Sequence, residues 1–169
     1  LRRLCPRRFP GKEQLYNELQ AVESVIGAFL LIRKSIWTTL GGLDERFFFF
    51  FEETDFCRQV HRKNLRVMHL PQVHVWHGQG KTAKQVSAAA RIEYWRSRYA
   101  YFAKNFGAAT RFALNAGILA RLLVDWLAAL LLALFTFGKS PRWRSRLKIC
   151  SALVVWHLRG CPPAAGLPR

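Results

Sequence analysis

The chain has few acidic residues, and its cysteines, prolines and glycines do not form a repetitive or disulfide-rich pattern. Only 10 of its 169 residues are Asp or Glu, against 27 Lys and Arg, so the formal net charge is +17. The 7 Pro and 11 Gly exclude collagen-like or linker-like material. The four cysteines never form a C-x-x-C pair, which argues against a disulfide scaffold and leaves a reduced, cytoplasmic setting as the default.

Two familiar signals are also missing. The sequence begins at Leu1 with the basic run LRRLCPRRFPGK instead of a signal peptide, so we expect a piece of a longer chain. The loop Gly78–Thr82 ends in G-K-T, but Val75 stands where the phosphate loop of an NTPase needs a glycine. Nucleotide binding by such a loop is therefore excluded.

Apolar residues make up 51% of the chain and aromatic residues 14%, which is enough to collapse into a core and excludes a disordered basic tail. In the last eighty residues the basic side chains alternate with Trp, Phe and Leu. That mixture suits an anionic membrane surface better than a nucleic-acid groove, and no base-reading motif is present. We therefore expect a membrane surface as a partner and no nucleic acid. The alternative is a non-enzymatic basic module that binds membrane surfaces or nucleic acid.

The first half of the sequence predicts alternating short elements. Residues 25–32 form a β-branched apolar run typical of a strand buried on both faces. Ser35 is a suitable N-cap for a short helix over 36–40, which Gly41 and Gly42 should end. A longer helix is expected from Glu52, with acids in its first turn and Asn64 as its stop, and two short strands over 67–70 and 73–77.

The second half predicts three helices: from Ser87 to about Phe106, over 108–137, and from the Ser140–Pro141 start signal onward. Residues 126–137 form a run of twelve uncharged residues. A membrane-spanning helix needs roughly 20 apolar residues, so this shorter run favours an interfacial or re-entrant helix. A tilted span of 23 residues from Ala116, carrying an Arg–Asp pair, remains open.

Five of the ten acids lie within twelve residues: Asp44, Glu45, Glu52, Glu53 and Asp55. On a helix from Glu52, Glu53 shares the apolar face, whereas Glu52 and Asp55 lie on the other side and complement the helix dipole. Glu53 should therefore point into the protein or a cleft. The helix N-terminus favours its ionised form, so it is a candidate general base.

His74 and His77 are three apart on an expected strand and face opposite sides. His77 ends that strand beside a glycine loop, where ligand-binding groups tend to lie. A zinc site would use Cys57 and His61, spaced i,i+4 on the helix, together with one of these histidines.

Four blocks in order carry a family resemblance: Gly27–Arg33, Leu40–Phe47, Phe51–Cys57 and Leu70–His77, with the sequences GAFLLIR, LGGLDERF, FEETDFC and LPQVHVWH. Together they resemble a bacterial family 2 glycosyltransferase, with rhamnosyltransferase-like and galactofuranosyltransferase-like members the most similar. The resemblance covers about residues 21–106. It implies an α/β fold in which this segment is the C-terminal part of a GT-A (Rossmann-like) catalytic domain.

In that scheme residues 1–20 are a loop from a missing N-terminal half, and residues 107–169 are a membrane-associating tail of amphipathic and hydrophobic helices. The implied reaction is an inverting glycosyl transfer in cell-envelope glycan synthesis. Its donor is a nucleotide-sugar such as dTDP-rhamnose, and its acceptor is a lipid-linked glycan or polysaccharide. The implied location is the cytoplasmic face of the inner or plasma membrane.

The resemblance also implies residue roles. The acidic pair of the family falls on Glu52 and Glu53, and its second member is the catalytic base. His77 falls where relatives help to hold a divalent cation, Mg²⁺ or Mn²⁺. The remaining implied substrate-binding residues are Gly27, Ala28, Asp44, Glu45, Glu52 and Trp76, although Asp44 and Glu45 fit a turn and its cap equally well.

The D-x-D metal motif of the family does not occur in this chain. The resemblance places that motif in the nucleotide-binding half, before residue 1. We therefore expect the isolated polypeptide to carry the acceptor side of a site without the donor side, and to be inactive by itself.

Overall fold

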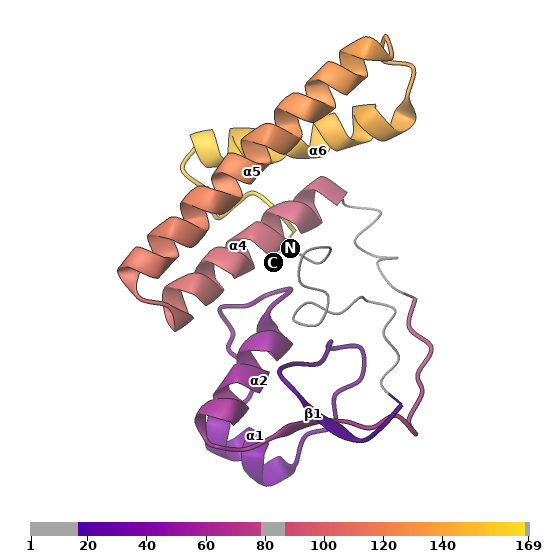
Figure 1. The fold of residues 1–169 in the computed structure, drawn as a ribbon. Coiled ribbons are helices and arrows are strands. Elements are labelled where there is room, and N and C mark those ends of the chain that lie inside the picture. The colour runs from indigo at the N-terminus through magenta and orange to yellow at the C-terminus, as the bar shows by residue number, and fades with distance from the viewer. Residues whose placement is uncertain (1–16, 79–86, 168–169) are drawn as a thin grey trace.

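The computed structural model describes residues 17–78 and 87–167, and it is mostly helical, with 58% helix and 4% strand. Figure 1 shows a helical end formed by the last three helices and a smaller end that holds the two strands and the first two helices. In chain order the elements are β1 (Gln20–Val22), α1 (Lys34–Leu40), α2 (Glu52–Arg62), β2 (Val67–His69), α4 (Ser87–Asn105), α5 (Ala108–Phe135) and α6 (Pro141–Leu158).

The predicted Rossmann-like α/β fold is wrong for this structure. The sheet has two antiparallel strands, β1 and β2, paired with Ala21 opposite Met68. The expected strand over 25–32 is irregular, with Ile26 and Leu31 exposed, and 73–77 is irregular as well. A strand buried on both faces needs neighbours at its edges and layers on both sides, and the described residues supply neither.

The helices agree better with the sequence. The structure confirms the starts at Glu52 and Pro141, although Ser140 caps α6 without a side-chain hydrogen bond. The helix expected from Ile36 begins at Lys34 instead, and it ends at Gly41, whose φ is 76°. The sequence predicts these helix ends well because the signals are local. Acidic residues mark the start of a helix, and a glycine in the left-handed region marks its end.

The run of five phenylalanines attaches the smaller end to α4. Phe47 is buried, while the rings of Phe50 and Phe51 pack against Tyr94, with centroids 5.3 and 5.4 Å away. The Ser97 hydroxyl of α4 donates a hydrogen bond of 2.8 Å to the carbonyl of Phe49. These contacts hold the loop before α2 against α4, and so fix where α2 begins.

The helical end has a core of its own. Helices α5 and α6 pack against each other, and α4 packs against both. The buried core residues are Ile92, Trp95, Leu122, Cys150, Leu153 and Trp156. The indole of Trp126 donates to the Ser151 hydroxyl across the α5–α6 interface at 2.9 Å.

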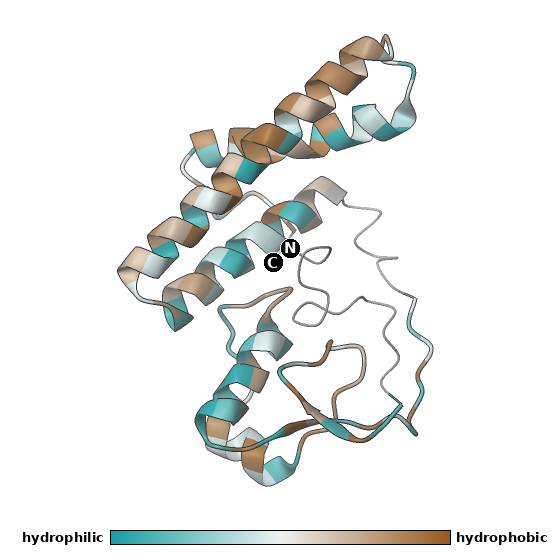
Figure 2. Cartoon of the chain, in the orientation of Figure 1, coloured by the Kyte–Doolittle hydropathy of each residue, from teal (hydrophilic) through white to brown (hydrophobic). Residues whose placement is uncertain are grey.

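One face of α5 has no protein partner among the described residues. Leu123, Leu127, Leu131 and Leu134 are each at least half exposed, and they recur every three or four residues. At about 100° per residue they lie opposite the buried residues of this helix. Figure 2 shows α5 hydrophobic along most of its length, beside a hydrophilic start of α6. By length and composition, α5 is able to cross a membrane.

Candidate functional site

The first turn of α2 carries the two adjacent glutamates. Phe51, in the left-handed region with φ 71°, caps the helix, and Glu52 and Glu53 follow in the first turn. Both side chains are half-buried, and each has one buried carboxylate oxygen (Oε2) without a hydrogen-bond partner among the described residues. A buried acceptor without a donor is costly, so these oxygens are suited to receive a ligand's hydrogen bond.

Glu53 lies against the loop that precedes α1, as its place on the helix predicts. A Cβ added to Gly27 would meet the Cβ, Cγ and Cδ atoms of Glu53 at 3.9 Å. Two of the predicted site residues, Gly27 and Glu53, are therefore neighbours, and Ala28 follows Gly27 in the same turn. The same loop reaches the middle of α2, where the backbone N–H of Val25 donates a hydrogen bond to the Cys57 thiol.

The surroundings of Glu52 act on the charge of its carboxyl group. Burial raises the pKa of Glu52, and the negative charge of Glu53 raises it further, against the lowering effect of a backbone hydrogen bond. A raised pKa disfavours the charged form of Glu52.

Asp55 has a different role from the one its helical position predicts. It was expected on the outer side of the helix, but it is only 1% exposed. Its carboxylate accepts hydrogen bonds from Gln59 at 2.8 Å, from Lys104 and from Asn105 at 3.1 Å. Helix α4 covers this second face of α2, and no periodicity within α2 could have revealed that. Asp55 is thus a structural ion-pair partner.

Asp44 is also held by cations. Its carboxylate accepts from the Arg46 side chain at 2.6 Å and from Lys104 at 2.6 Å, and from the Arg46 backbone N–H at 3.0 Å. The hydrogen bonds from Arg46, followed by Lys104, hold the pKa of Asp44 well below its usual range. This is the turn-and-cap arrangement that the sequence allowed. Glu45 beside it is exposed, and the substrate-binding role of both residues stays a prediction.

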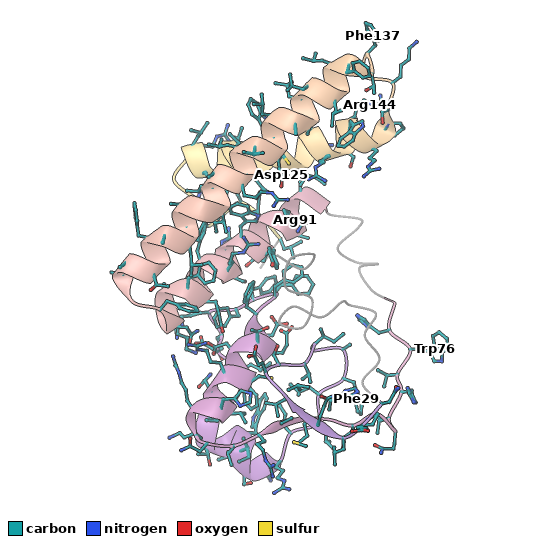
Figure 3. All side chains as sticks on the ribbon, viewed as in Figure 1. Phe29, Trp76, Arg91, Asp125, Phe137 and Arg144 are labelled. Carbon is teal, nitrogen blue, oxygen red and sulfur yellow. The ribbon has the colours of Figure 1, made fainter. Side chains whose placement is uncertain are left out.

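Trp76 and His77 lie elsewhere. Both are exposed on the irregular segment after β2, and Figure 3 shows Trp76 projecting outward at the margin of the molecule. Among the described residues, neither has a hydrogen bond or ion pair to the acidic turn of α2. The structure therefore does not bring His77 together with Glu53, and its metal-binding role stays a prediction.

A divalent cation needs several oxygen or nitrogen ligands that converge. Within residues 17–78 and 87–167 no group of three His, Cys, Asp or Glu side chains could hold a metal ion. The same finding argues against the zinc site of Cys57, His61 and a further histidine. Burial also raises the pKa of the Cys57 thiol, which disfavours the thiolate form that zinc binds. The residues described here do not fit a metal site by themselves.

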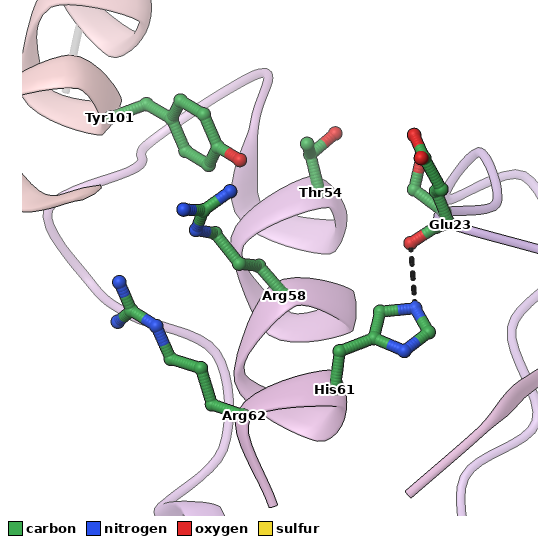
Figure 4. A pocket seen from close by; sticks show the side chains of 7 residues that line it. Glu23, Thr54, Arg58, His61, Arg62 and Tyr101 are labelled. Carbon is green, nitrogen blue, oxygen red and sulfur yellow. Dashed lines mark hydrogen bonds between the residues drawn. The ribbon is translucent and has the colours of Figure 1, made fainter. Parts of the chain in front are cut away.

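A cleft that the sequence did not indicate lies beside this turn. It has a volume of about 510 Å³ and opens between α2, the loop after β1 and α4. Its lining residues are Glu23, Ser24, Thr54, Arg58, His61, Arg62 and Tyr101, six of which are labelled in Figure 4. Thr54, Arg58 and Arg62 are spaced four residues apart and therefore lie along one side of the helix. This spacing could have indicated the cleft, although no separate surface was predicted from it.

Comparison with known proteins gives one partial similarity. Over 70 residues the chain is 33% identical to the low-salt glycan biosynthesis hexosyltransferase Agl10 of Haloferax volcanii. The matched segment is 41% of this chain and 22% of that protein, so the chain spans about a fifth of its relative. No family model matches the chain, and no solved structure matches it. The similarity supports a relationship to a glycosyltransferase.

Proposed function

We propose that this chain takes part in glycosyl transfer for glycan biosynthesis, with Glu53 as the general base. The observation that carries the proposal is the half-buried Glu53 carboxylate, which has an unpartnered oxygen beside the Gly27 loop. The partial similarity to a hexosyltransferase supports the same class of reaction. The narrower assignment to a family 2 rhamnosyltransferase rests on the four sequence blocks alone.

The proposed chemistry needs one carboxylate. As the acceptor hydroxyl oxygen attacks the anomeric carbon, its proton passes to Glu53, and the bond from that carbon to the nucleoside diphosphate breaks. A single displacement inverts the configuration at the anomeric carbon, and no second nucleophile is involved. Since the described residues form no metal site, this proposal assigns them no step that uses a cation.

The acceptor is proposed to be a lipid-linked glycan, because α5 and α6 fit a membrane surface. We further propose that α5 lies in the plane of the membrane instead of crossing it. The ion pairs Arg121–Asp125 and Arg146–Asp125, each 3.2 Å, lie near the middle of α5. A spanning α5 would place these charges deep in the hydrocarbon, at a cost of about 2.5–3.5 kcal/mol each at the centre.

The start of α6 supports the same orientation. Arg142, Arg144, Arg146 and Lys148 follow within the first eight residues of α6, next to the tip of the hairpin. Figure 3 shows Arg144 and Phe137 together at this tip. Residues 87–169 contain thirteen Lys and Arg against two Asp and Glu. Lying flat, the hairpin would bury the exposed leucines of α5 and keep the basic side chains at anionic headgroups.

The proposal is tested by a transfer assay on the protein expressed from its complete reading frame. Membranes that contain it are incubated with labelled nucleotide-sugars, and incorporation into lipid-linked product is measured. Glu53→Gln should lower turnover by about 10²–10⁴-fold, the usual contribution of a general base. The exposed Glu18→Gln is the matched control and should keep the wild-type rate. Full turnover of Glu53→Gln would contradict the proposal.

A further inference from the structure

Two arginines in the cleft of Figure 4 lack partners. Arg58 and Arg62 lie one turn apart on α2, and both line the cleft. No hydrogen bond or ion pair joins either guanidinium to another described residue, and the Nε of Arg58 is buried without an acceptor. A buried donor left unpaired costs about 1–3 kcal/mol, more when charged.

Several other arginines of the described chain are held by acids, and the exposed ones without an ion pair, such as Arg66, face solvent, whereas the Nε of Arg58 is buried. Arg46 is paired with Asp44, Arg96 with Glu93, and Arg146 with Asp125. Helix α2 also has three acids in its first turn, yet none of them meets its arginines. The unpaired donors are therefore available to a ligand.

The cleft adds further donors and fixes one arginine. The guanidinium carbon of Arg58 lies 5.1 Å from the centre of the Phe106 ring, a cation–π contact that limits how the side chain turns. The Tyr101 hydroxyl points toward Arg58 in Figure 4, and Thr54 also lines the cleft. No described residue provides a hydrogen-bond partner for either hydroxyl. Two guanidinium groups with two hydroxyls form a donor set that suits phosphate oxygens.

The opposite wall limits where an anion would lie. Glu23 is on that wall, and its backbone carbonyl lies 3.1 Å from Nε2 of His61. The Glu23 carboxylate would repel an anion close to it. A ligand would therefore occupy the side formed by α2 and Tyr101.

We propose that the cleft lined by Arg58, Arg62, Tyr101 and Thr54 binds the diphosphate group of a ligand. Two arginines one turn apart offer about 5–6 Å between their Cβ atoms, a spacing that two linked phosphates can bridge. Thr54 directly follows Glu53, and the segment from Glu23 to Gly27 touches both the cleft and that carboxylate. That the diphosphate belongs to a transferase substrate rests on the proposed function, whereas the binding of the anion does not.

The direct test is titration of the 169-residue chain with inorganic pyrophosphate by calorimetry, at fixed low salt. The double variant Arg58→Ala/Arg62→Ala should weaken binding by about ten- to a hundredfold, because charge-assisted hydrogen bonds are lost. Arg33→Ala/Arg66→Ala is the matched control, since it removes the same two charges from exposed sites outside the cleft. It should change the dissociation constant by less than about threefold, as screened surface charges do.

Two results would overturn the proposal. One is wild-type affinity for pyrophosphate in the double variant, with its fold verified by circular dichroism. The other is an equal loss in Arg33→Ala/Arg66→Ala, which would indicate attraction by the net charge alone. Should the double variant fail to fold, Arg58→Lys and Tyr101→Phe replace it. The first keeps the charge without the bidentate fork and the second removes one hydroxyl, so each should weaken binding severalfold.

Two further ligands separate the sources of the diphosphate. A prenyl diphosphate represents a lipid-linked acceptor, and dTDP represents the nucleotide of a donor. The ligand that loses affinity in the double variant identifies the source, and loss for neither would contradict the proposal. The transfer assay with this variant separates the two proposals: pyrophosphate binding without any transfer in the wild type would overturn the proposed function alone, and transfer at the wild-type rate in the double variant would overturn the diphosphate site alone.

Discussion

At the scale of single residues, Lys104 of α4 joins two carboxylates that come from different parts of the chain. Its ammonium group contacts both Asp44 and Asp55, and each of these acids has further donors. Both acids belong to the acidic cluster of residues 44–55, in which the sequence predicted a helix-dipole role for Asp55 and a substrate or turn role for Asp44. Their role in the structure is to fix the loop and α2 against α4.

Asp55→Ala should lower the free energy of unfolding by about 1–3 kcal/mol, because it removes the shared acceptor of Gln59, Lys104 and Asn105, while Lys104 keeps Asp44 as its partner. Urea unfolding followed by circular dichroism measures this loss. The exposed Glu45→Ala is the control and should change the stability by less than about 0.5 kcal/mol. A similar small change for Asp55→Ala would contradict the structural role.

Asp44 should make the free energy of unfolding depend on pH in the acidic range. Because its pKa lies below the ordinary value of 3.8, its contribution to stability is present above about pH 4 and is lost as the pH falls toward the folded-state pKa. We therefore expect the free energy of unfolding to decrease less steeply in Asp44→Asn than in the wild type between about pH 5 and 2.5. If the free energies of unfolding of Asp44→Asn and the wild type fell equally with pH, the Arg46 and Lys104 contacts would not act on this carboxyl.

Glu52 should act in the opposite direction, since its pKa is raised above the ordinary value of 4.5. Its contribution is present below that value and is lost as the pH rises through the folded-state pKa. Glu52→Gln should therefore raise the melting temperature at pH 7, and the difference from the wild type should vanish below about pH 4. A melting temperature of Glu52→Gln below that of the wild type at pH 7 would contradict burial as the cause of the raised pKa.

The helix period predicted the position of Glu53 correctly and that of Asp55 wrongly, for one physical reason. The helix period places Glu53 on the face with Phe56 and Cys57, and that face is buried against the smaller end of the molecule. Asp55 is buried by α4, more than thirty residues away in sequence. A helix period reports one apolar face, and it does not reveal a second face covered through charged contacts.

At the scale of elements, local sequence signals predicted the ends of helices correctly, because the signals at a helix end do not depend on tertiary neighbours. Asn64, expected as the stop of α2, has a φ of 57°, and Gly41 ends α1. The expected strand over 25–32 failed because an apolar β-branched run becomes a strand only when another strand pairs with it. Here the partner of β2 is β1, a segment that no pattern had marked.

The turn after α1 offers a matched pair of glycine substitutions. Gly41 and Gly42 both have positive φ, 76° and 81°, but only at Gly42 would a Cβ lie 3.0 Å from the Trp37 ring. Gly41→Ala should cost about 1 kcal/mol for the backbone conformation alone. Gly42→Ala should cost clearly more, because the Trp37 ring must also move. Equal losses in thermal unfolding would contradict the packing of this turn.

At the scale of the whole molecule, the apolar face of α5 and the basic start of α6 predict binding to anionic vesicles. Leu131→Gln should weaken binding roughly tenfold, since a buried leucine contributes about 1.5–3 kcal/mol. Leu70→Gln, at an exposed site on the smaller end, is the control and should bind as the wild type does. Flotation with vesicles that contain phosphatidylserine measures both. Equal binding by the two variants would contradict an α5 interface.

The apolar and basic character of α5 and α6 could be predicted from composition, whereas their geometry could not. Composition gave the apolar run and the basic residues near it. Only the structure shows that Arg146 of α6 reaches Asp125, and that the α5 leucines lack a partner in the described chain. The cleft with Arg58 and Arg62 was likewise out of reach, because Tyr101 and Glu23 join it from distant parts of the sequence.

The proposed base is tested most directly by steady-state kinetics of Glu53→Gln against the lipid-linked acceptor, with Glu18→Gln as the control. A base acts in the transition state, so we expect kcat to fall by about 10²–10⁴-fold while the acceptor KM stays within about threefold. A raised KM with an unchanged kcat would show that Glu53 only binds the acceptor, and it would contradict the assignment of this carboxylate as the proton acceptor.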